Sequence, residues 1–387
     1  MISSSSEIEW DCPECQTAIT DRRKYCNSCQ SMLVWTCIPS GKSGLYNNYH
    51  RYRNRCNYCT PELEEERQQL KTENRISRFQ EIAISDNEQR PWSEWSRSDE
   101  SCTQHTEHDI EQVQQVFNMW EQSLIEFCMN RKQQHTTDTN NKFLSPINLL
   151  AVTLWYLKHY RSERYIAAEL NFSKSTVNYF LSAVVDILYA SAYPKLILLP
   201  DDMDDEATAY GPEQYHKLIV DSTFIAIHQP EDFDQRKAYY HAKSPTNYAF
   251  KIQITCDFNH RIVHVSKYYQ GSVHDITVLR ESGLLEHIEE HVQIIADKGY
   301  IGEQYVITSR KKPRGGELTA EDKDFNRSIS SARAAIENIN QRIKNYAILG
   351  SIYRGAYDDF DKITRIAHVV SALCNLKLSK HPIRNER

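Results

Sequence analysis

The chain has 387 residues, of which 40% are hydrophobic and 25% are charged, and its formal net charge is −6 at pH 7. This length predicts roughly two to three domains with at least one sizeable core. No apolar run approaches the roughly 18 residues that span a bilayer. The N-terminus also lacks the basic start and apolar core of a secretion signal. We therefore expect no membrane partner, and a nuclear protein if the source is eukaryotic or a cytoplasmic one otherwise.

Cysteines concentrate near the N-terminus, with seven of the 11 in the first 59 residues. In an intracellular chain, such clustering favours metal binding over disulfides. Two sets of four ligands have the paired spacing of tetrahedral Zn²⁺ sites: Cys12, Cys15, Cys26 and Cys29, and then Cys37, His50, Cys56 and Cys59. His50 is the least certain ligand, and another pairing of the thiolates remains open. Residues 1–60 are thus predicted to form a small zinc-binding module.

Arginines and tyrosines alternate near the end of this module. Arg51, Arg53 and Arg55 lie among three tyrosines, a composition typical of surfaces that contact phosphates and bases. We favour DNA as the partner of the module, with a protein partner as the alternative. Residues 61–108 are predicted to be a charged helix followed by a flexible linker, because aliphatic residues are sparse there.

Residues 109–200 are predicted to be helical. Ser145-Pro146 is an N-cap and first-turn pair, and a short helix from about Ser162 leads through a brief turn to another that begins after Ser173. Two helices joined in this way are typical of a helix-turn-helix, whose second helix enters the major groove of DNA. Its first residues, Lys174, Ser175 and Thr176, are then the expected base-facing contacts. Ordinary helix packing is the alternative.

Residues 209–380 are predicted to be an α/β domain. The order is strand, hairpin, helix, strand and late helices, which is the order of a ribonuclease-H-like mixed sheet flanked by helices. Asp221 ends the apolar run 218–220, Asp297 ends the run 294–296, and Glu337 lies in a helix-prone segment. In that fold, acids at these positions lie close together.

Clustered carboxylates repel one another unless a hard cation with oxygen ligands offsets their charge. Mg²⁺ or Mn²⁺ is the expected ion. Two such ions roughly 3.5–4 Å apart activate the attacking oxygen and stabilise the leaving oxygen of a phosphoryl transfer. For each acid alone, a role as a turn residue or a solvated helix residue is the alternative.

Several motifs in order resemble the DDE transposases of the Harbinger superfamily and their bacterial insertion-sequence relatives. They are Val220-Asp221-Ser222-Thr223, Gly271-Ser272-Val273-His274-Asp275, Ala296-Asp297-Lys298-Gly299-Tyr300 and a C-terminal R-x3-E-x6-K pattern in Arg333, Glu337 and Lys344. The resemblance covers about residues 145–375. The family signature often has Tyr where this chain has Ser330, and the cysteine-rich N-terminus is not a general feature of the family.

The resemblance implies that Asp221, Asp297 and Glu337 are the catalytic triad and that Asp275 is a further acid that binds the metal. Arg333 and Lys344 project from the same helix face as Glu337 and are expected to hold DNA phosphates. Tyr300 is either a base-stacking residue or a core tyrosine.

The function that follows is a DNA transposase that binds terminal inverted repeats, cuts them and joins them to target DNA. The expected partner is double-stranded DNA, bound by a homodimer or higher oligomer, with an accessory DNA-binding protein as a further possible partner. The alternatives are a host-adopted nuclease that only cuts and a DNA-binding protein without catalysis.

Overall fold

The computed structural model describes residues 10–11, 18–19, 34–36, 43–45, 91–134, 144–200, 216–288, 292–357 and 359–383. The chain divides into two units, Met1–Ile82 and Ala83–Arg387. The described parts of the first unit are two short antiparallel hairpins, β1 (Trp10–Asp11) with β2 (Ala18–Ile19) and β3 (Val34–Thr36) with β4 (Ser43–Leu45). All predicted zinc ligands and Arg51, Arg53 and Arg55 lie outside the described residues, so the zinc module stays a prediction.

The second unit opens with a helical region. Its helices are α2 (Trp92–Trp95), α3 (Asp99–Thr106), α4 (Ile110–Gln134), α5 (Pro146–His159), α6 (Glu163–Leu170) and α7 (Lys174–Leu196). Ser145, Ser162 and Ser173 cap α5, α6 and α7 as expected, each accepting a backbone N–H with its hydroxyl. Helix α5 is buried along most of its length because α3, α4 and α7 pack around it.

The flexible linker predicted up to residue 108 is wrong from Pro91 onward, because α2 and α3 occupy this segment. Aromatic contacts replace the missing aliphatic ones. Trp95 stacks on His105 with ring centroids 4.6 Å apart and also contacts Trp155 of α5. The backbone N–H of Trp92 donates to Oδ1 of Asn148 at 2.8 Å. Tryptophan rings bury enough area to order a segment that has few aliphatic residues.

The remainder of the second unit is built on a mixed sheet with strand order β10-β9-β5-β6-β7, in which β8 also pairs with β6. Its strands are β5 (His216–Ala226), β6 (Ala249–Asp257), β7 (Ile262–Val265), β8 (Tyr269–Gln270), β9 (Gln293–Ile295) and β10 (Val306–Ile307). β5 is antiparallel to β6 and parallel to β9. The mixed sheet, its hairpin and its central first strand therefore agree with the predicted fold class.

Helices cover both faces of this sheet. They are α8 (Phe233–Tyr239), α9 (Asp275–Glu281), α10 (Ala320–Lys344), α11 (Ala347–Gly350) and α12 (Phe360–Lys380), with 3-10 turns η2 (Leu284–His287) and η3 (Lys298–Tyr300). Side chains alternate along β5, so Val220 packs with Leu279 of α9, whereas Ile225 lies beside Ile343 of α10. Helix α9 ends at Glu281, and Gly283 then turns the chain with a positive φ of 80°.

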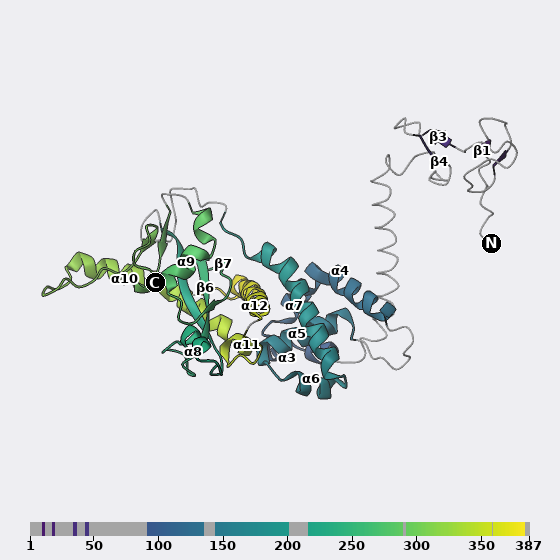
Figure 1. The fold of residues 1–387 in the computed structure, drawn as a ribbon, viewed down its shortest axis with the longest axis horizontal. Helices are drawn as coiled ribbons and strands as arrows, with labels where there is room; N and C mark the ends of the chain where they lie inside the picture. The colour runs from purple at the N-terminus through teal and green to yellow at the C-terminus, as the bar shows by residue number, and fades with distance from the viewer. Residues whose placement is uncertain are drawn as a thin grey trace. The chain divides into compact units, whose positions relative to one another are not determined.

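The helical region is joined to the sheet through α12. Figure 1 shows α12 between the sheet and the helices that precede it, and α12 contacts both α7 and β7. Glu107, after α3, forms ion pairs with Lys158 of α5 and Lys377 of α12. Nε2 of the buried His108 lies 2.7 Å from the hydroxyl of Tyr346. These contacts hold the helical region against the elements that surround the sheet.

Within the part of the chain that the structure describes, no helix is both long enough and apolar enough to cross a membrane. The four cysteines described there, Cys102, Cys128, Cys256 and Cys374, are free thiols and all are buried.

Candidate active site

Asp221 and Asp297 occupy equivalent places on neighbouring strands. β5 and β9 run parallel, and Ile219 pairs with Ile295. Each aspartate follows its paired isoleucine by two residues, Asp221 within β5 and Asp297 just after β9. Because parallel strands rise by the same distance per residue, the two aspartates reach the same level of the sheet. The structure thus brings together two acids that lie far apart in the sequence.

Asp275 joins these two acids from the start of α9. Its Oδ2 lies 2.6 Å from the position that a Cβ on Gly299 would occupy, and Oδ1 of Asp297 lies 2.9 Å from the same position. Gly299 also donates its backbone N–H to Oδ1 of Asp297 at 2.7 Å. A side chain at residue 299 would force the two carboxylates to move, so glycine at this position permits their approach.

Asp221 has the most perturbed acidity of the group. Burial is the main cause that raises the pKa of this carboxyl to about 6; the charges of Asp297 and Asp275 act in the same direction, and Arg333 opposes them. Burial and nearby negative charge both favour the protonated form of a carboxyl group. Such clusters are characteristic of functional sites.

Glu337 is placed on the expected helix but not in the same cluster. It lies on α10 with 61% of its side chain exposed, and its Oε1 is 3.4 Å from Nη2 of Arg333, one turn earlier. The residue that reaches Asp221 from this helix is the buried Asn340, whose Nδ2 donates to Oδ2 of Asp221 at 3.0 Å. Glu337 and Asn340 are three residues apart and therefore share one helix face.

The basic residues predicted beside the acids are both near Asp221. Arg333 lowers the pKa of Asp221. Partial desolvation lowers the pKa of Lys344, and the negative charge of Asp221 opposes that shift. The side of α10 that carries Arg333, Asn340 and Lys344 therefore faces Asp221. We call Asp221, Asp275, Asp297 and Glu337 the acidic site.

Lys251 is a site residue that the sequence analysis did not identify. Only 5% of its side chain is exposed, and Nζ lies 3.0 Å from Oδ1 of Asp275. Nζ also donates to the carbonyl of Val273, and it lies 5.6 Å from the ring centroid of Phe224. The signal in the sequence was that Lys251 is the one cation of this strand, whose other polar residues are Gln253, Thr255 and Asp257. A buried lysine needs an acidic partner.

Tyr300 is a core residue and not a base-stacking one. Its side chain is fully buried, and its hydroxyl lies 2.9 Å from Oγ of Ser222. Of the two predicted roles, the core role is the one that the structure supports.

Each acid at this site has a partner in the protein itself. Asp221 accepts a hydrogen bond from Asn340, and Asp297 accepts one from the N–H of Gly299. Asp275 forms an ion pair with Lys251, and Glu337 forms one with Arg333. Among the described residues, no group of three or more acids, histidines or cysteines is arranged to hold a metal ion as it stands. The four carboxylates, which come from four separate segments, nevertheless fit a hard divalent cation, which would take the place of these partners.

The helix-turn-helix residues lie at the start of α7. Asn171 ends α6 in the left-handed region with φ 56°, and the turn leads directly to Lys174. Lys174 and Ser175 are exposed, whereas Thr176 is half-buried and receives a 2.9 Å hydrogen bond from Ser173. The first two predicted contacts are thus available to a ligand.

Two family models match this chain in that same order. Residues 142–194 match the helix-turn-helix of DDE superfamily endonuclease, and residues 220–376 match the DDE superfamily endonuclease. The match confirms the resemblance to DDE transposases, and the helix-turn-helix before it indicates a protein that binds DNA.

The chain is also similar to a probable transposase for insertion sequence element IS702 from Microchaete diplosiphon. The two are 26% identical over 213 residues, which is 54% of this chain and 73% of the relative. No solved structure matches the chain significantly. DDE endonucleases generally use divalent metals such as Mg²⁺, which agrees with the acidic donor set described above.

Proposed function

We propose that the chain is a DNA transposase that binds the terminal repeats of its element, cuts the DNA there and joins the cut end to a target. The single observation that carries this proposal is the meeting of Asp221, in the middle of β5, with Asp297, just after β9, and Asp275, at the start of α9. Repulsion between neighbouring carboxylates destabilises the fold. Their proximity is therefore expected where a cationic substrate or cofactor binds them.

In this proposal, Asp221, Asp297 and Glu337 are the catalytic acids and Asp275 is an additional metal-binding acid. When bound, divalent cations neutralise these carboxylates and stabilise the attacking and leaving oxygens of an in-line phosphoryl transfer. Glu337 would exchange its partner, Arg333, for this role. Little free energy opposes the loss of this ion pair, because its atoms are 3.4 Å apart and 61% of the Glu337 side chain is exposed.

Basic side chains of α10 would bind the strand that is cut. Release from Glu337 leaves the planar guanidinium of Arg333 to pair with a phosphate, and Lys344 presents a point charge nearby. The exposed Lys174 and Ser175 of α7 would contact base edges in the major groove. The proposed active form is a homodimer or higher oligomer, because two transposon ends are to be processed together.

The test uses the purified full-length chain and a duplex that ends in the terminal repeat flanking its own reading frame. We expect cleavage with Mg²⁺ or Mn²⁺ and none after chelation. Joined products with a second duplex support a transposase, whereas cut ends that never join support the host-adopted nuclease. Specific binding without cleavage under any divalent ion would favour the regulatory alternative and contradict the proposal.

We propose in addition that residues 1–60 bind two Zn²⁺ ions, on the strength of the two ligand sets in the sequence. Four thiolate or imidazole ligands per ion form a closed structural site. Metal analysis of the full-length chain is expected to give two zinc ions per chain. One ion per chain would show that the set containing His50 was misassigned, and zero would contradict both sets.

A further inference from the structure

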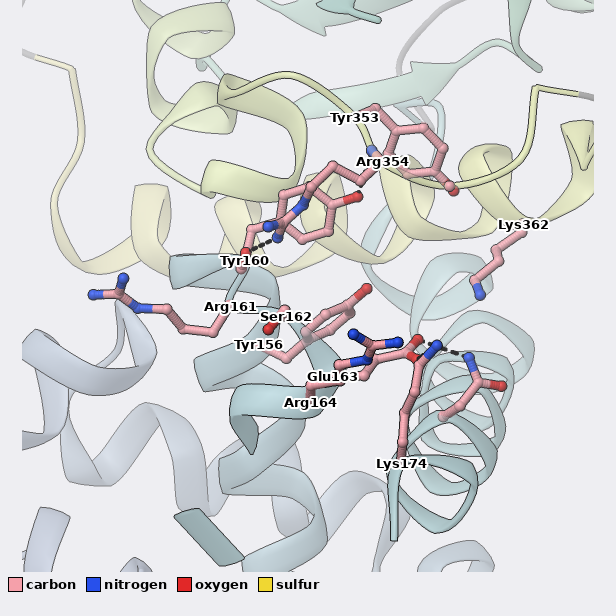
Figure 2. A pocket seen from close by; sticks show the side chains of 12 residues that line it. Tyr156, Tyr160, Arg161, Ser162, Glu163, Arg164, Lys174, Tyr353, Arg354 and Lys362 are labelled. Atoms are coloured by element: carbon pink, nitrogen blue, oxygen red, sulfur yellow. Dashed lines mark hydrogen bonds and ion pairs between the residues drawn. The ribbon is translucent and has the colours of Figure 1, made fainter. Parts of the chain in front are cut away.

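A cavity of about 450 Å³ lies between the helix-turn-helix and the segment that joins α11 to α12. Five cations line it: Arg161, Arg164, Lys174, Arg354 and Lys362. Figure 2 shows Arg354 and Lys362 entering from the C-terminal segments, opposite Arg164 and Lys174. We call this cavity and its five cations the basic cleft. Its residues come from both halves of the second unit, so it is not a property of the helix-turn-helix alone.

Charge in the basic cleft is not balanced by the protein. Glu163 is the one carboxylate that lines it. Oε1 of Glu163 already accepts from Nδ2 of Asn178 at 2.7 Å, and Oε2 lies 3.9 Å from Nζ of Lys174. In the described ranges, the side chains of Arg164 and Lys362 have no ion-pair partner. An excess of cations around a cavity favours an anionic ligand.

Arg354 is held in place before any ligand arrives. Its backbone N–H donates to the hydroxyl of Tyr160 at 2.8 Å, and its guanidinium donates to the carbonyl of the same residue. The guanidinium also lies 4.1 Å from the centroid of the Tyr160 ring, and that ring stacks on Tyr353. A guanidinium has five N–H donors, so this fixed side chain retains donors for a ligand. Such pre-organisation lowers the cost of binding.

The residues around the basic cleft restrict the side from which an anionic ligand can enter it. The neighbouring cavity shares Tyr156, Glu163, Asn178 and Lys362 with it, but three further acids line that cavity: Asp186, Asp359 and Asp361. A polyanion is therefore repelled from that side. Towards the start of α7, the cleft meets Lys174, next to the exposed Ser175.

The basic cleft is also connected to the strand that carries Asp221. The backbone N–H of Tyr353 donates to the carbonyl of Ala226 at 2.7 Å, and Tyr353 bridges Ile227 just beyond β5. Arg354, the next residue, thus has its backbone position set by the end of the catalytic strand.

From these observations, we infer that the basic cleft binds the sugar–phosphate backbone of the DNA that the helix-turn-helix reads. The inference rests on the proposed function only in taking DNA as the ligand. Phosphodiesters match the planar guanidinium of Arg354 and the point charge of Lys362. The cleft therefore contributes affinity without sequence preference, and it holds the helix-turn-helix and the catalytic half on one piece of DNA.

The experiment measures DNA binding by fluorescence anisotropy over a range of salt concentrations. Arg164→Gln and Lys362→Gln each remove a charge without leaving a described partner unpaired. We expect each to weaken binding equally for the terminal repeat and for a scrambled duplex of the same length. Each lost phosphate contact should reduce the slope of log affinity against log salt by about 0.9. The double variant should bind roughly tenfold more weakly or worse, given the usual strength of charge-assisted contacts.

Lys195→Gln is the matched control, because it removes one exposed charge from the other end of α7 and does not line the cleft. It should keep the wild-type affinity and salt slope. Circular dichroism of every variant guards against misfolding. Wild-type affinity and slope in the double variant would overturn the inference. Weaker binding of the terminal repeat alone would also overturn it, because phosphate contacts do not distinguish sequences.

Free nucleotides carry the same phosphate chemistry, and ATP is the probe for that source. Micromolar binding of ATP that Arg164→Gln abolishes, with DNA binding unchanged, would assign the cleft to a small molecule and overturn the inference. Failure of the proposed function can be told apart from failure of the inference about the basic cleft. A chain that binds DNA through the cleft yet never cuts it contradicts the proposed function alone. A wild-type chain that binds neither duplex contradicts both.

Discussion

The acidic site and the basic cleft both concentrate charge of one sign, but the protein treats the two differently. At the acidic site, every carboxylate has a hydrogen-bond or ion-pair partner in the protein, including Asn340 for Asp221 and Lys251 for Asp275. In the basic cleft, Arg164 and Lys362 have no ion-pair partner in the described ranges. A cation at the acidic site would therefore have to replace existing partners of the acids, whereas an anion in the basic cleft would meet cations without ion-pair partners.

The largest expected effect comes from removing the acids. Asp221→Ala or Asp297→Ala should slow cleavage by more than roughly 1000-fold, because several kcal/mol of transition-state stabilisation depend on the cations that they hold. DNA affinity should stay at the wild-type level, since the basic cleft is untouched. Single-turnover cleavage and anisotropy measure the two quantities.

Glu337→Ala tests whether the carboxylate of Glu337 exchanges its ion pair with Arg333 for a catalytic role. A loss as large as that of Asp297→Ala is expected. Glu321→Ala is its control, because Glu321 is an exposed acid near the start of the same helix, with 85% of its side chain accessible. Wild-type cleavage by the Glu337→Ala protein would remove Glu337 from the catalytic acids.

A smaller but still large effect is expected from Gly299→Ala. The new methyl group would lie 2.6 Å from Asp275 and 2.9 Å from Asp297, so the carboxylates must separate. Displacement of catalytic groups by about 1 Å costs roughly 100-fold in rate. Gly316→Ala is the control, because its methyl group would meet only ordinary contacts at 3.5 Å and beyond. Equal rates for the two variants would show that the approach of the two acids is not needed.

Asn340→Ala should slow cleavage by roughly tenfold to 100-fold, the usual range for residues that orient a metal ligand. Its amide holds Asp221 in position and does not touch the substrate, so the apparent affinity for Mg²⁺ should fall together with the rate. Asn338→Ala is the matched control, because that amide only bonds back to the carbonyl of Ala334 on its own helix. A Mg²⁺ titration that coincides with wild type would contradict a positioning role for Asn340.

The smallest effect concerns stability and pH at the junction between the helical region and the catalytic half. Burial lowers the pKa of His108 from 6.5 to about 4. Between these values, the native chain binds fewer protons than the unfolded one, so stability is complete above pH 6.5 and is lost as the pH falls towards 4. The contribution of His108 is up to about 3 kcal/mol, at roughly 1.4 kcal/mol per unit of pKa.

Denaturant unfolding at a series of pH values tests this expectation. His108→Gln keeps a polar group for the hydroxyl of Tyr346 but removes the titration. Its unfolding free energy should therefore fall less steeply below pH 6.5 than that of the wild type. Parallel curves would show that His108 does not carry this dependence.

Much of the fold followed from local patterns in the sequence. The caps Ser145, Ser162 and Ser173 fixed the helix starts, because capping depends on neighbouring residues alone. The apolar runs before Asp221 and Asp297 identified the two strands. Their adjacency followed from the fold class, which several ordered motifs indicated together.

The partners of the acids did not follow from the sequence. Lys251 meets Asp275, and Asn340 meets Asp221, only through the pairing of strands and the packing of α10. The direction of the Glu337 side chain is likewise a matter of rotamer choice, which sequence spacing does not determine. Residues 91–108 were misjudged because aliphatic content was taken as the measure of order, although Trp95 and its aromatic neighbours stabilise this segment.

The burial of Cys102, Cys128, Cys256 and Cys374 has a consequence for chemical labelling of the native protein. A thiolate is the species that reacts with alkylating reagents, and burial raises the pKa of Cys374 to about 12 and that of Cys256 well above its usual range. These four thiols should therefore remain unmodified while the fold is intact. Iodoacetamide labelling read by mass spectrometry, with and without a zinc chelator, then reports on the seven N-terminal cysteines without mutation of the rest of the chain.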